Sequence, residues 1–406
     1  MKYAFVLGRE SALSTAELLA ALKAAEVGFE PKTALYSASI LIAETQKPLD
    51  TEFFHTLGGS IKMAEVLGIS TKSLEDDLFN VLNNLGGTSL DFGLSLYSLD
   101  REPDRTYRSM EYGLKALSLT LKKRLKEGER SVRAVLGDAP ALTSVQVDKN
   151  KLIEKGGELL LIVGQGALRI AKTVAVQAYE DFSARDFGRP AHDAKSGMLP
   201  PKLARMMVNL SGAPKDEPLL DAFCGSGTIL TEAADLGYRQ LVGSDISEKA
   251  VADTKTNCAW IVRERNFQGV NLNVFTSDVK DLPSKLPDGA VSAIVSEPFL
   301  GPPLRGDESD QKIHFTYLEL MGLYRRAFNA FSRILKPGGK VVFVFPVFGT
   351  KHANILRELE DYGFRAEGLL PAVAVEALGA KSSTGLSYKR PDQKVGRDIF
   401  RFRYNP

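Results

Sequence analysis

One stretch decides the fold of the C-terminal half, Leu219-Leu220-Asp221-Ala222-Phe223-Cys224-Gly225-Ser226-Gly227-Thr228-Ile229-Leu230. Its first residues are apolar, as in a buried strand, and a turn with two glycines leads from them into a helix. Glycines let a backbone approach a ligand closely, and the start of a helix offers free amide donors. The stretch therefore predicts a strand, a turn and a helix, with a ligand bound against the turn.

A second strand, at 240–244, ends in Asp245, whose carboxylate is placed to accept both hydroxyls of a ribose. Dinucleotide dehydrogenases use the same geometry, but two details argue against NAD. Leu230 stands where the NAD fingerprint has its third glycine or alanine. Asp221 ends the first strand, where the amino group of a methionine, rather than a pyrophosphate, would need a partner. No lysine follows Gly227, so a P-loop is excluded as well.

Two further strands end in polar residues. The strand at 273–275 leads to Asp278, where the amino group of an adenine is expected, and the strand at 290–295 ends in Ser296-Glu297-Pro298-Phe299. Ligands in open α/β sheets bind at the carboxyl ends of the strands. We therefore expect these four strand ends to form one binding edge.

Composition excludes several classes of protein. The chain has 406 residues, so we expect two or three domains. Two cysteines, Cys224 and Cys258, and four histidines exclude a disulfide framework, and we expect no metal site. No apolar run is long enough to cross a bilayer, and the apolar stretch near Met1 is too short for a signal peptide, so we expect a cytoplasmic protein. The net charge of +2 gives no nucleic-acid signal.

Alternating strand-like and helix-like segments indicate the domain organisation. Residues 183–194 are polar and lack periodicity, which indicates a linker. We expect four parts: an N-terminal α+β module at 1–60, a second module at 61–178, a linker at 179–197 and an open α/β sheet at 198–406.

Several motifs resemble a known family. Residues 221–228 resemble the first motif of class I methyltransferases that act on exocyclic amines, Asp-Pro-Phe/Met-Cys-Gly-Ser-Gly-Thr. Residues 197–210, the ending at 388–400 and the opening residues with Gly58 to Gly68 look like corresponding parts of the THUMP-domain tRNA guanosine-N2 methyltransferases. The resemblance implies an α/β fold: a C-terminal class I, Rossmann-like methyltransferase sheet preceded by ferredoxin-like and THUMP modules.

The same resemblance implies the activity and the site. It implies S-adenosyl-L-methionine as cofactor and methylation of the N2 amine of a guanosine in tRNA, of the position 10 type. It assigns cofactor contacts to Asp221, Phe223, Gly225, Gly227, Thr228, Asp245, Ile246, Asp278 and Val279, with the methionine end at the glycine turn, the ribose at Asp245 and the adenine at Asp278. It assigns the guanine to Ser296, Glu297, Pro298 and Phe299.

The catalytic motif departs from the family pattern, Asp/Asn-Pro-Pro-Tyr/Phe. Ser296 replaces the acid or amide, and Glu297 replaces the first proline. Either Glu297 compensates as an acceptor, or the target base or the activity has changed. The alternatives are an rRNA or DNA exocyclic-amine methyltransferase, and a non-catalytic RNA-binding protein that retains the cofactor fold. Methylation at pyrimidine C5 is disfavoured because no cysteine nucleophile lies beside the motif.

Basic residues in the N-terminal half are candidates for RNA contacts, or they form a solvated helix face. The resemblance to THUMP domains favours RNA contacts at Lys122, Lys123, Arg124, Arg130 and Arg133. Arg305 is a further candidate, because loops directly after the catalytic motif commonly shape the substrate pocket. Such contacts position an RNA without reading its sequence. Arg185, Arg189 and Lys195 in the linker either touch RNA or are solvated. We expect tRNA as the partner, no membrane association and, as a working assumption, a monomer.

Overall fold

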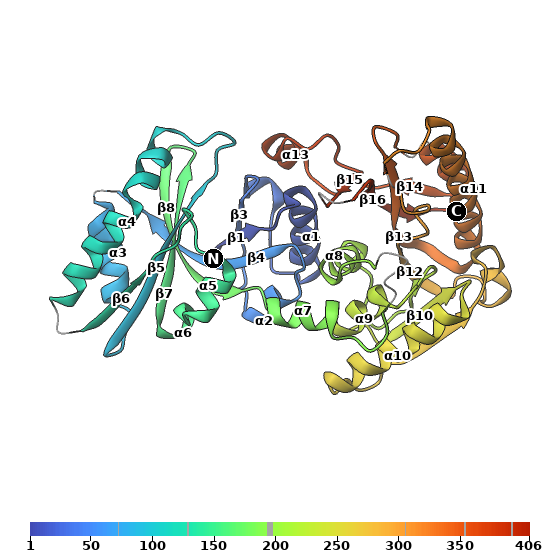
Figure 1. Cartoon of the computed structure of the whole chain (residues 1–406), viewed down its shortest axis with the longest axis horizontal. Coiled ribbons are helices and arrows are strands. Elements are labelled where there is room, and N and C mark those ends of the chain that lie inside the picture. The colour runs from blue at the N-terminus through green and yellow to red at the C-terminus, as the bar shows by residue number, and fades with distance from the viewer. Residues whose placement is uncertain (72, 128–129, 193–197, 305, 353–354, 391–392) are drawn as a thin grey trace. The chain divides into compact units, whose positions relative to one another are not determined.

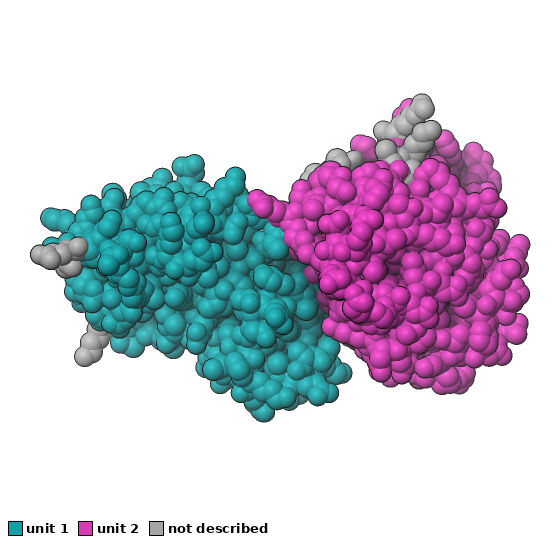
Figure 2. Space-filling model, turned by 90° about the horizontal axis from the view of Figure 1, so that it is seen from below, with its two compact units in different colours: residues 1–179, 371–381 teal, residues 180–370, 382–406 magenta. Residues whose placement is uncertain are grey.

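The computed structural model describes residues 1–71, 73–127, 130–192, 198–304, 306–352, 355–390 and 393–406 (Figure 1). They form two compact units, residues 1–179 with 371–381 and residues 180–370 with 382–406 (Figure 2). The short segment 371–381 therefore belongs with the first unit although it lies near the C-terminus in sequence. The four-part division expected from the sequence stays a prediction.

Unit 1 is built on one mixed sheet with the strand order β2-β3-β1-β4-β8-β7-β5-β6. Its strands are β1 (Lys2–Leu7), β2 (Leu35–Tyr36), β3 (Ile40–Glu44), β4 (Ser60–Ile69), β5 (Ser89–Ser98), β6 (Ser131–Val135), β7 (Gly156–Gly164) and β8 (Ala167–Val176). Strand β5 runs parallel to β6 and β7, and the other pairs are antiparallel. Because β4 pairs with both β1 and β8, the two modules expected at 1–60 and 61–178 share this sheet.

The helices of unit 1 cover this sheet. They are α1 (Ser11–Ala24), α2 (Thr51–His55), α3 (Leu74–Asn83), α4 (Arg105–Lys126), α5 (Ser144–Lys149), α6 (Leu152–Lys155) and α13 (Ala372–Leu378), with a 3₁₀ turn η1 (Pro31–Thr33). Helix α4 buries Leu114, Ser118, Leu121 and Leu125, whose spacing places them on one helical face. This face packs with α3 over β5 and β6 (Figure 1).

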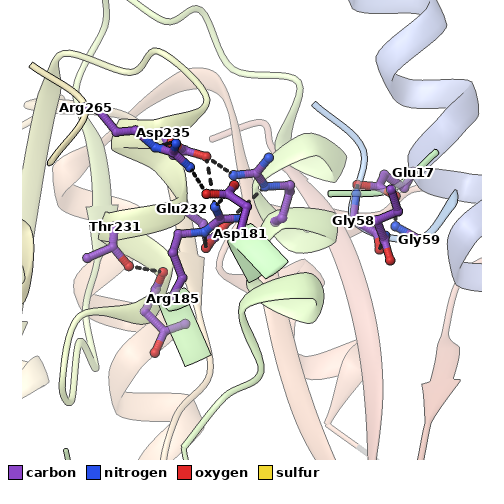
Figure 3. Close-up of polar contacts among 12 residues, drawn as sticks. Glu17, Gly58, Gly59, Asp181, Arg185, Thr231, Glu232, Asp235 and Arg265 are labelled. Atoms are coloured by element: carbon purple, nitrogen blue, oxygen red, sulfur yellow. Dashed lines mark hydrogen bonds and ion pairs between the residues drawn. The ribbon is translucent and has the colours of Figure 1, made fainter. Parts of the chain in front are cut away.

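Two buried carboxylates hold unit 1 together. The Glu17 carboxylate on α1 accepts hydrogen bonds of 2.7 Å from the amides of Gly58 and Gly59, so it fixes the start of β4 (Figure 3). Glu158 on β7 forms a fully buried ion pair with Lys62 on β4 and accepts a 2.6 Å hydrogen bond from the Thr173 hydroxyl. Since a buried charge is tolerated only when it is paired, these contacts fix the register of the central strands.

Unit 2 is an open sheet with the strand order β11-β10-β9-β12-β13-β16-β14, and β15 pairs with β16. Its strands are β9 (Leu219–Asp221), β10 (Gln240–Asp245), β11 (Asn271–Thr276), β12 (Val291–Ser296), β13 (Leu335–Phe348), β14 (Phe364–Ala366), β15 (Leu386–Tyr388) and β16 (Val395–Tyr404). The first five strands along the order are parallel, and β16 is antiparallel to its neighbours. The order reverses between β9 and β12, and open α/β sheets bind ligands beyond the carboxyl ends of the strands at such a point.

Helices flank this second sheet. They are α7 (Tyr179–Phe187), α8 (Pro201–Ser211), α9 (Thr228–Asp235), α10 (Glu248–Glu264), α11 (Asp310–Ile334) and α12 (Leu356–Asp361), with a 3₁₀ segment η2 (Val279–Ser284). Helix α11 packs Tyr324 and Phe328 edge-on against Phe343 of β13, with ring centroids 5.4 Å and 5.1 Å apart. Among the described residues, no helix is both long and apolar enough to cross a membrane.

A buried ion network joins α7, α8 and the C-terminal end of α10 to the middle and end of α9. Fully buried Glu232 on α9 accepts a 2.6 Å hydrogen bond from Arg185 Nε on α7 and one of 2.7 Å from Arg205 Nε on α8 (Figure 3). Three charged side chains extend it: Asp181, Asp235 and Arg265.

This network shows that Arg185, expected to touch RNA or to be solvated, is instead buried. The segment is helical as far as Phe187. Arg185 is buried because it pairs with Glu232, which lies far along the chain, and no local periodicity reveals such a partner.

We predict that Glu232→Gln strongly destabilises the protein. The change leaves Arg185 and Arg205 buried with less opposing charge, which costs about 3 to 5 kcal/mol for a broken buried pair. Urea unfolding of the full chain, followed by circular dichroism, measures the loss. Glu358→Gln, which breaks an exposed ion pair with Arg325, is the control and should cost far less. Equal losses for the two variants would contradict the prediction.

Candidate active site

The carboxyl ends of four neighbouring parallel strands lie side by side in unit 2. Strands β9, β10, β11 and β12 are adjacent in the sheet and bring Asp221, Asp245, Asp278 and Ser296 to one edge. A hydrogen bond also joins the turn after β9 to β10, since the Cys224 amide donates to the Ser244 carbonyl at 2.9 Å. The residues that the sequence places at four strand ends therefore lie at one edge of the sheet.

The glycine turn after β9 is held from behind by α10. Gly225 and Gly227 have φ values of 51° and 85°, which favour glycine. The Thr254 hydroxyl donates to the Gly225 carbonyl at 2.8 Å, and the Asn257 amide donates to the Ser226 carbonyl at 2.8 Å. A Cβ at Gly227 would lie 3.1 Å from the Thr254 Cα, whereas a Cβ at Gly225 would meet nothing within 4 Å. The turn is thus packed on one side and open at Gly225.

Asp245 stands at the open side of this turn. One carboxylate oxygen accepts from the Gly225 amide at 3.0 Å and the other from the Ser247 amide at 2.9 Å. An ionised carboxylate has about four lone-pair sites, so each oxygen retains capacity for a ligand hydroxyl. Ile246, the next residue, is 72% exposed and offers an apolar side chain beside the carboxylate.

The third strand end is less enclosed. Asp278 is half-buried, and its Oδ1 accepts a 3.2 Å hydrogen bond from the Lys280 amide at the start of η2. The Lys280 ammonium lies 3.4 Å from the other oxygen. Val279 is buried beneath this turn. The Asp278 carboxylate is therefore oriented by contacts with Lys280, two residues further along the chain.

Asp221 is the most deeply buried acid of the edge, at 1% exposure. Its Oδ1 accepts a 2.9 Å hydrogen bond from the Ser296 hydroxyl and one of 3.2 Å from the Phe223 amide. Burial raises the pKa of Asp221 to about 7, and the negative charges of Asp245 and Glu297 also raise it. The two hydrogen bonds act in the opposite direction and lower this pKa. A cation beside Asp221 would favour its ionised form.

Both departures from the family motif are built into the surrounding structure. The fully buried Ser296 hydroxyl donates to Asp221 and accepts from the Ala222 amide at 2.9 Å. Glu297 forms a two-pronged ion pair with Arg397 of β16, with N–O distances of 2.6 Å and 3.2 Å. Ser296 thus ties β12 to β9, and Glu297 ties the loop after β12 to β16.

The end of the motif presents an aromatic ring. Phe299, after Pro298, is 58% exposed, and its carbonyl accepts a 2.7 Å hydrogen bond from the Tyr324 hydroxyl of α11. The main chain is therefore anchored while the ring stays open to solvent. Such a ring can stack on a planar base.

Cys224 is not placed as a nucleophile. Burial raises the pKa of its thiol, and the Thr254 hydroxyl contacts its sulfur at 3.5 Å. Burial also raises the pKa of Cys258, to about 12. A thiol with a raised pKa carries little thiolate at neutral pH, so neither residue is suited to attack a pyrimidine ring.

Sequence analysis missed the burial of the linker arginines. Arg185 and Arg189 are each 3% exposed rather than solvated, and Lys195 lies outside the described residues. The Arg189 guanidinium donates to the hydroxyl of Thr228, the first residue of α9, at 2.6 Å. Arg189 therefore lies at the glycine turn, a position that no local signal in its polar segment indicates.

The candidates for RNA contacts lie in and after α4, except Arg305, which is outside the described residues. Arg124 pairs with an aspartate of α3, and Arg133 pairs with one of β5, at 2.6 Å and 2.7 Å. Arg130 donates to main-chain carbonyls that follow α3. Lys122 is half-buried and Lys123 exposed. The three arginines thus hold α3, β5 and their neighbours together as well as adding positive charge.

Comparisons with known proteins agree with this architecture. Residues 189–353 match the family UPF0020, described as RMKL-like, methyltransferase domain. A tRNA (guanine(10)-N2)-dimethyltransferase from Methanothermobacter thermautotrophicus is 32% identical over 222 residues, which are 54% of this chain and 57% of that protein. The chain thus spans little more than half the length of that relative.

Two further proteins define the family and the fold. A probable tRNA (guanine(10)-N2)-dimethyltransferase from Methanothermococcus thermolithotrophicus is 31% identical over 35% of this chain and 78% of its own length. The crystal structure of TrmN from Thermus thermophilus covers 100% of both chains with a TM-score of 0.54 and 15% identity, which concerns the fold alone. The expected fold class is confirmed. The chain belongs to the family of THUMP-domain tRNA guanosine-N2 methyltransferases.

Proposed function

We propose that this protein transfers a methyl group from S-adenosyl-L-methionine to the exocyclic N2 amine of a guanosine in tRNA, at a site of the position 10 type. One observation carries the proposal: Asp221, Asp245, Asp278 and the Ser296–Phe299 motif lie at the ends of four neighbouring strands on one edge. Donor and acceptor sites at one edge bring the methyl group and the amine together, which is the main requirement of such a transfer.

The proposed cofactor site runs along β9, β10 and β11. Asp221 would hold the ammonium of the methionine part, since the raised pKa of this carboxyl falls when a cation approaches. The free lone pairs of Asp245 would accept the ribose hydroxyls, and Asp278 would accept from the adenine amine. The open face of Gly225 would allow close approach of the cofactor, which when bound supplies an activated methyl group on its sulfonium.

The proposed guanine site lies at the end of β12. Phe299 would stack on the flipped base. An aryl amine is a weak nucleophile because its lone pair is delocalised into the ring, so acceptors that hydrogen-bond its two N–H groups, one of which loses its proton on transfer, assist the reaction. The Ser296 hydroxyl is fully buried and engaged with Asp221 and the Ala222 amide, so main-chain carbonyls after β12 would accept from the amine. Glu297 acts by positioning, because both of its oxygens are held by Arg397.

The proposal of tRNA as the partner rests on the relatives and on unit 1. The relatives described above are named for an activity on tRNA. The exposed face of α4 adds positive charge, with Lys115, Lys123 and Lys126 exposed. Cationic side chains of this kind bind phosphates without sequence preference.

Methyl transfer with separate RNA pools tests the proposal. Purified protein with radiolabelled S-adenosylmethionine should label tRNA and leave rRNA and DNA unlabelled. Nuclease digestion of the tRNA followed by mass spectrometry should identify N2-methylated guanosine. Labelling of rRNA or DNA instead would contradict the substrate. Cofactor binding without any transfer would implicate the altered motif, in which Ser296 replaces the family's acid or amide. Absence of cofactor binding would favour a non-catalytic RNA-binding protein.

We predict that Asp245→Ala weakens binding of S-adenosylmethionine by about 1 to 3 kcal/mol, because hydrogen bonds from the ribose hydroxyls to a charged acceptor are lost. That is a rise in Kd of roughly 5- to 150-fold, measured by titration calorimetry. Asp288→Ala removes an exposed carboxylate before β12 and should leave Kd unchanged. A wild-type Kd in the Asp245 variant would place the ribose elsewhere.

We predict that cofactor binding strengthens as the pH rises toward 7. Binding of the ammonium requires ionised Asp221, whose pKa in the free protein is about 7, so below this pH binding must displace a proton. The affinity should therefore fall by up to about tenfold per pH unit below pH 7, where the amino group of the cofactor stays protonated. Calorimetry at several pH values measures this slope.

Two controls isolate Asp221 from its charged neighbours Asp245 and Glu297. Methylthioadenosine lacks the amino-acid part, so its affinity should show no such slope. Asp221→Asn cannot ionise and should flatten the slope for S-adenosylmethionine. Equal slopes for both ligands in the wild type would refute the assignment of Asp221 to the ammonium.

We predict that Glu297→Gln slows methyl transfer without weakening cofactor binding. The change breaks the ion pair with Arg397 and loosens the loop that carries Phe299, away from the cofactor-binding strands. Misplacement of the base should lower kcat by about 10- to 100-fold. The double variant with Arg397→Gln should lose no more than the single variant if the pair acts as a unit. Parallel losses in Kd for the cofactor and in kcat would contradict this role.

A further inference from the structure

Arg189 is a buried cation with no ion-pair partner among the residues that the structure describes. In the described part of unit 2, four arginines are almost fully buried: Arg185, Arg189, Arg205 and Arg397. Three of them form ion pairs with a glutamate, Glu232 or Glu297. Within the described residues, Arg189 has no carboxylate in ion-pairing distance. Since a buried charge is stable only when it is compensated, Arg189 calls for an anion.

The hydrogen bonds of the Arg189 guanidinium leave it under-satisfied. One terminal nitrogen donates to the Thr228 hydroxyl at 2.6 Å, and the other contacts the Met198 sulfur, a weak acceptor, at 2.9 Å. The Nε atom is buried with no acceptor. Burial lowers the pKa of Arg189, although the charges of Asp186 and Glu232 oppose this, and an arginine stays protonated at neutral pH.

The surroundings of this guanidinium favour an anion. Thr228 is the first residue of α9, which begins at Gly227 without a side-chain cap. A helix N-terminus carries partial positive charge and unpaired amides, and it attracts carboxylates and phosphates. The turn just before it is open at Gly225. An arginine and a helix start at the same place form a site for a small anionic group.

We propose that Arg189 binds the α-carboxylate of the methionine part of S-adenosylmethionine. The inference rests on the proposed function and deepens it. The amino-acid end of this cofactor is a zwitterion, and the glycine turn would then offer it a carboxylate, Asp221, and a guanidinium, Arg189. When the cofactor binds, Asp221 would pair with its ammonium group and Arg189 with its carboxylate.

Three ligands test the proposal on the full chain. S-adenosylmethionine carries the carboxylate, decarboxylated S-adenosylmethionine lacks it, and methylthioadenosine lacks the whole amino-acid part. In the wild type, S-adenosylmethionine should bind more tightly than its decarboxylated form. In Arg189→Gln its Kd should rise by roughly 10- to 100-fold, as for loss of hydrogen bonds between charged groups. The Kd values of the other two ligands should stay unchanged.

Further variants control for indirect effects. Arg325→Gln removes an exposed arginine of the same unit and should change no Kd. Arg189→Lys keeps the positive charge and should lose less affinity for S-adenosylmethionine than Arg189→Gln. If neither Arg189 variant folds, the ligand preference of the wild type decides, and equal affinity for the carboxylated and decarboxylated forms overturns the proposal.

The remaining outcomes separate the two levels of inference. Equal losses for all three ligands in Arg189→Gln would show that Arg189 only supports the fold of the turn, and would overturn the proposal. Unchanged cofactor affinity with weaker tRNA binding would assign Arg189 to an RNA phosphate and overturn it as well. A wild-type protein that binds none of the three ligands would overturn the proposed function together with it.

Discussion

The candidate site of unit 2 depends on the compensation of charge around Glu232. This fully buried carboxylate lies on α9 and pairs with one arginine from α7 and one from α8. Helix α9 begins directly at the glycine turn, so its position sets the position of the turn. A shift of α9 relative to its neighbours would leave at least one buried charge without a partner, which is energetically costly. The ion network therefore fixes the helix start against which a ligand would bind.

A second constraint acts at the point where the strand order reverses. Strands β9 and β12 are neighbours there, and the hydrogen bond between Ser296 and Asp221 joins their ends. The Ser296 hydroxyl makes two contacts at once, because it donates to Asp221 and also accepts from a main-chain amide of the loop after β9. Glu297 occupies the place of a proline in the family motif and gains a buried arginine as its partner. Each residue that differs from the family motif, Ser296 and Glu297, thus has a buried polar partner in this structure.

Two buried ionisable side chains of opposite sign lie at the glycine turn. A deeply buried carboxyl, Asp221, lies at the end of β9, and a buried guanidinium, Arg189, lies at the start of α9. Neither finds an opposite charge in direct contact among the described residues, whereas the other buried arginines nearby are paired. Two uncompensated groups of opposite sign favour a zwitterionic ligand over a simple anion or cation. Unit 1 differs, because its buried Glu158 and Lys62 compensate each other.

The sequence by itself was enough to predict the strand, turn and helix at 219–230 and to place acidic residues at the ends of the following strands. These features depend on local spacing. Because the carboxyl ends of parallel strands meet at one edge of a sheet, the local spacing also predicts that these residues lie at the same edge. Only the tertiary structure revealed the partner of Glu297, since Arg397 lies 100 residues further along the chain. It also buried Arg185 and Arg189, in a polar segment that reads as a solvated linker. The physical reason is that the burial of a charge depends on a partner brought close by folding, and a local pattern carries no record of that partner.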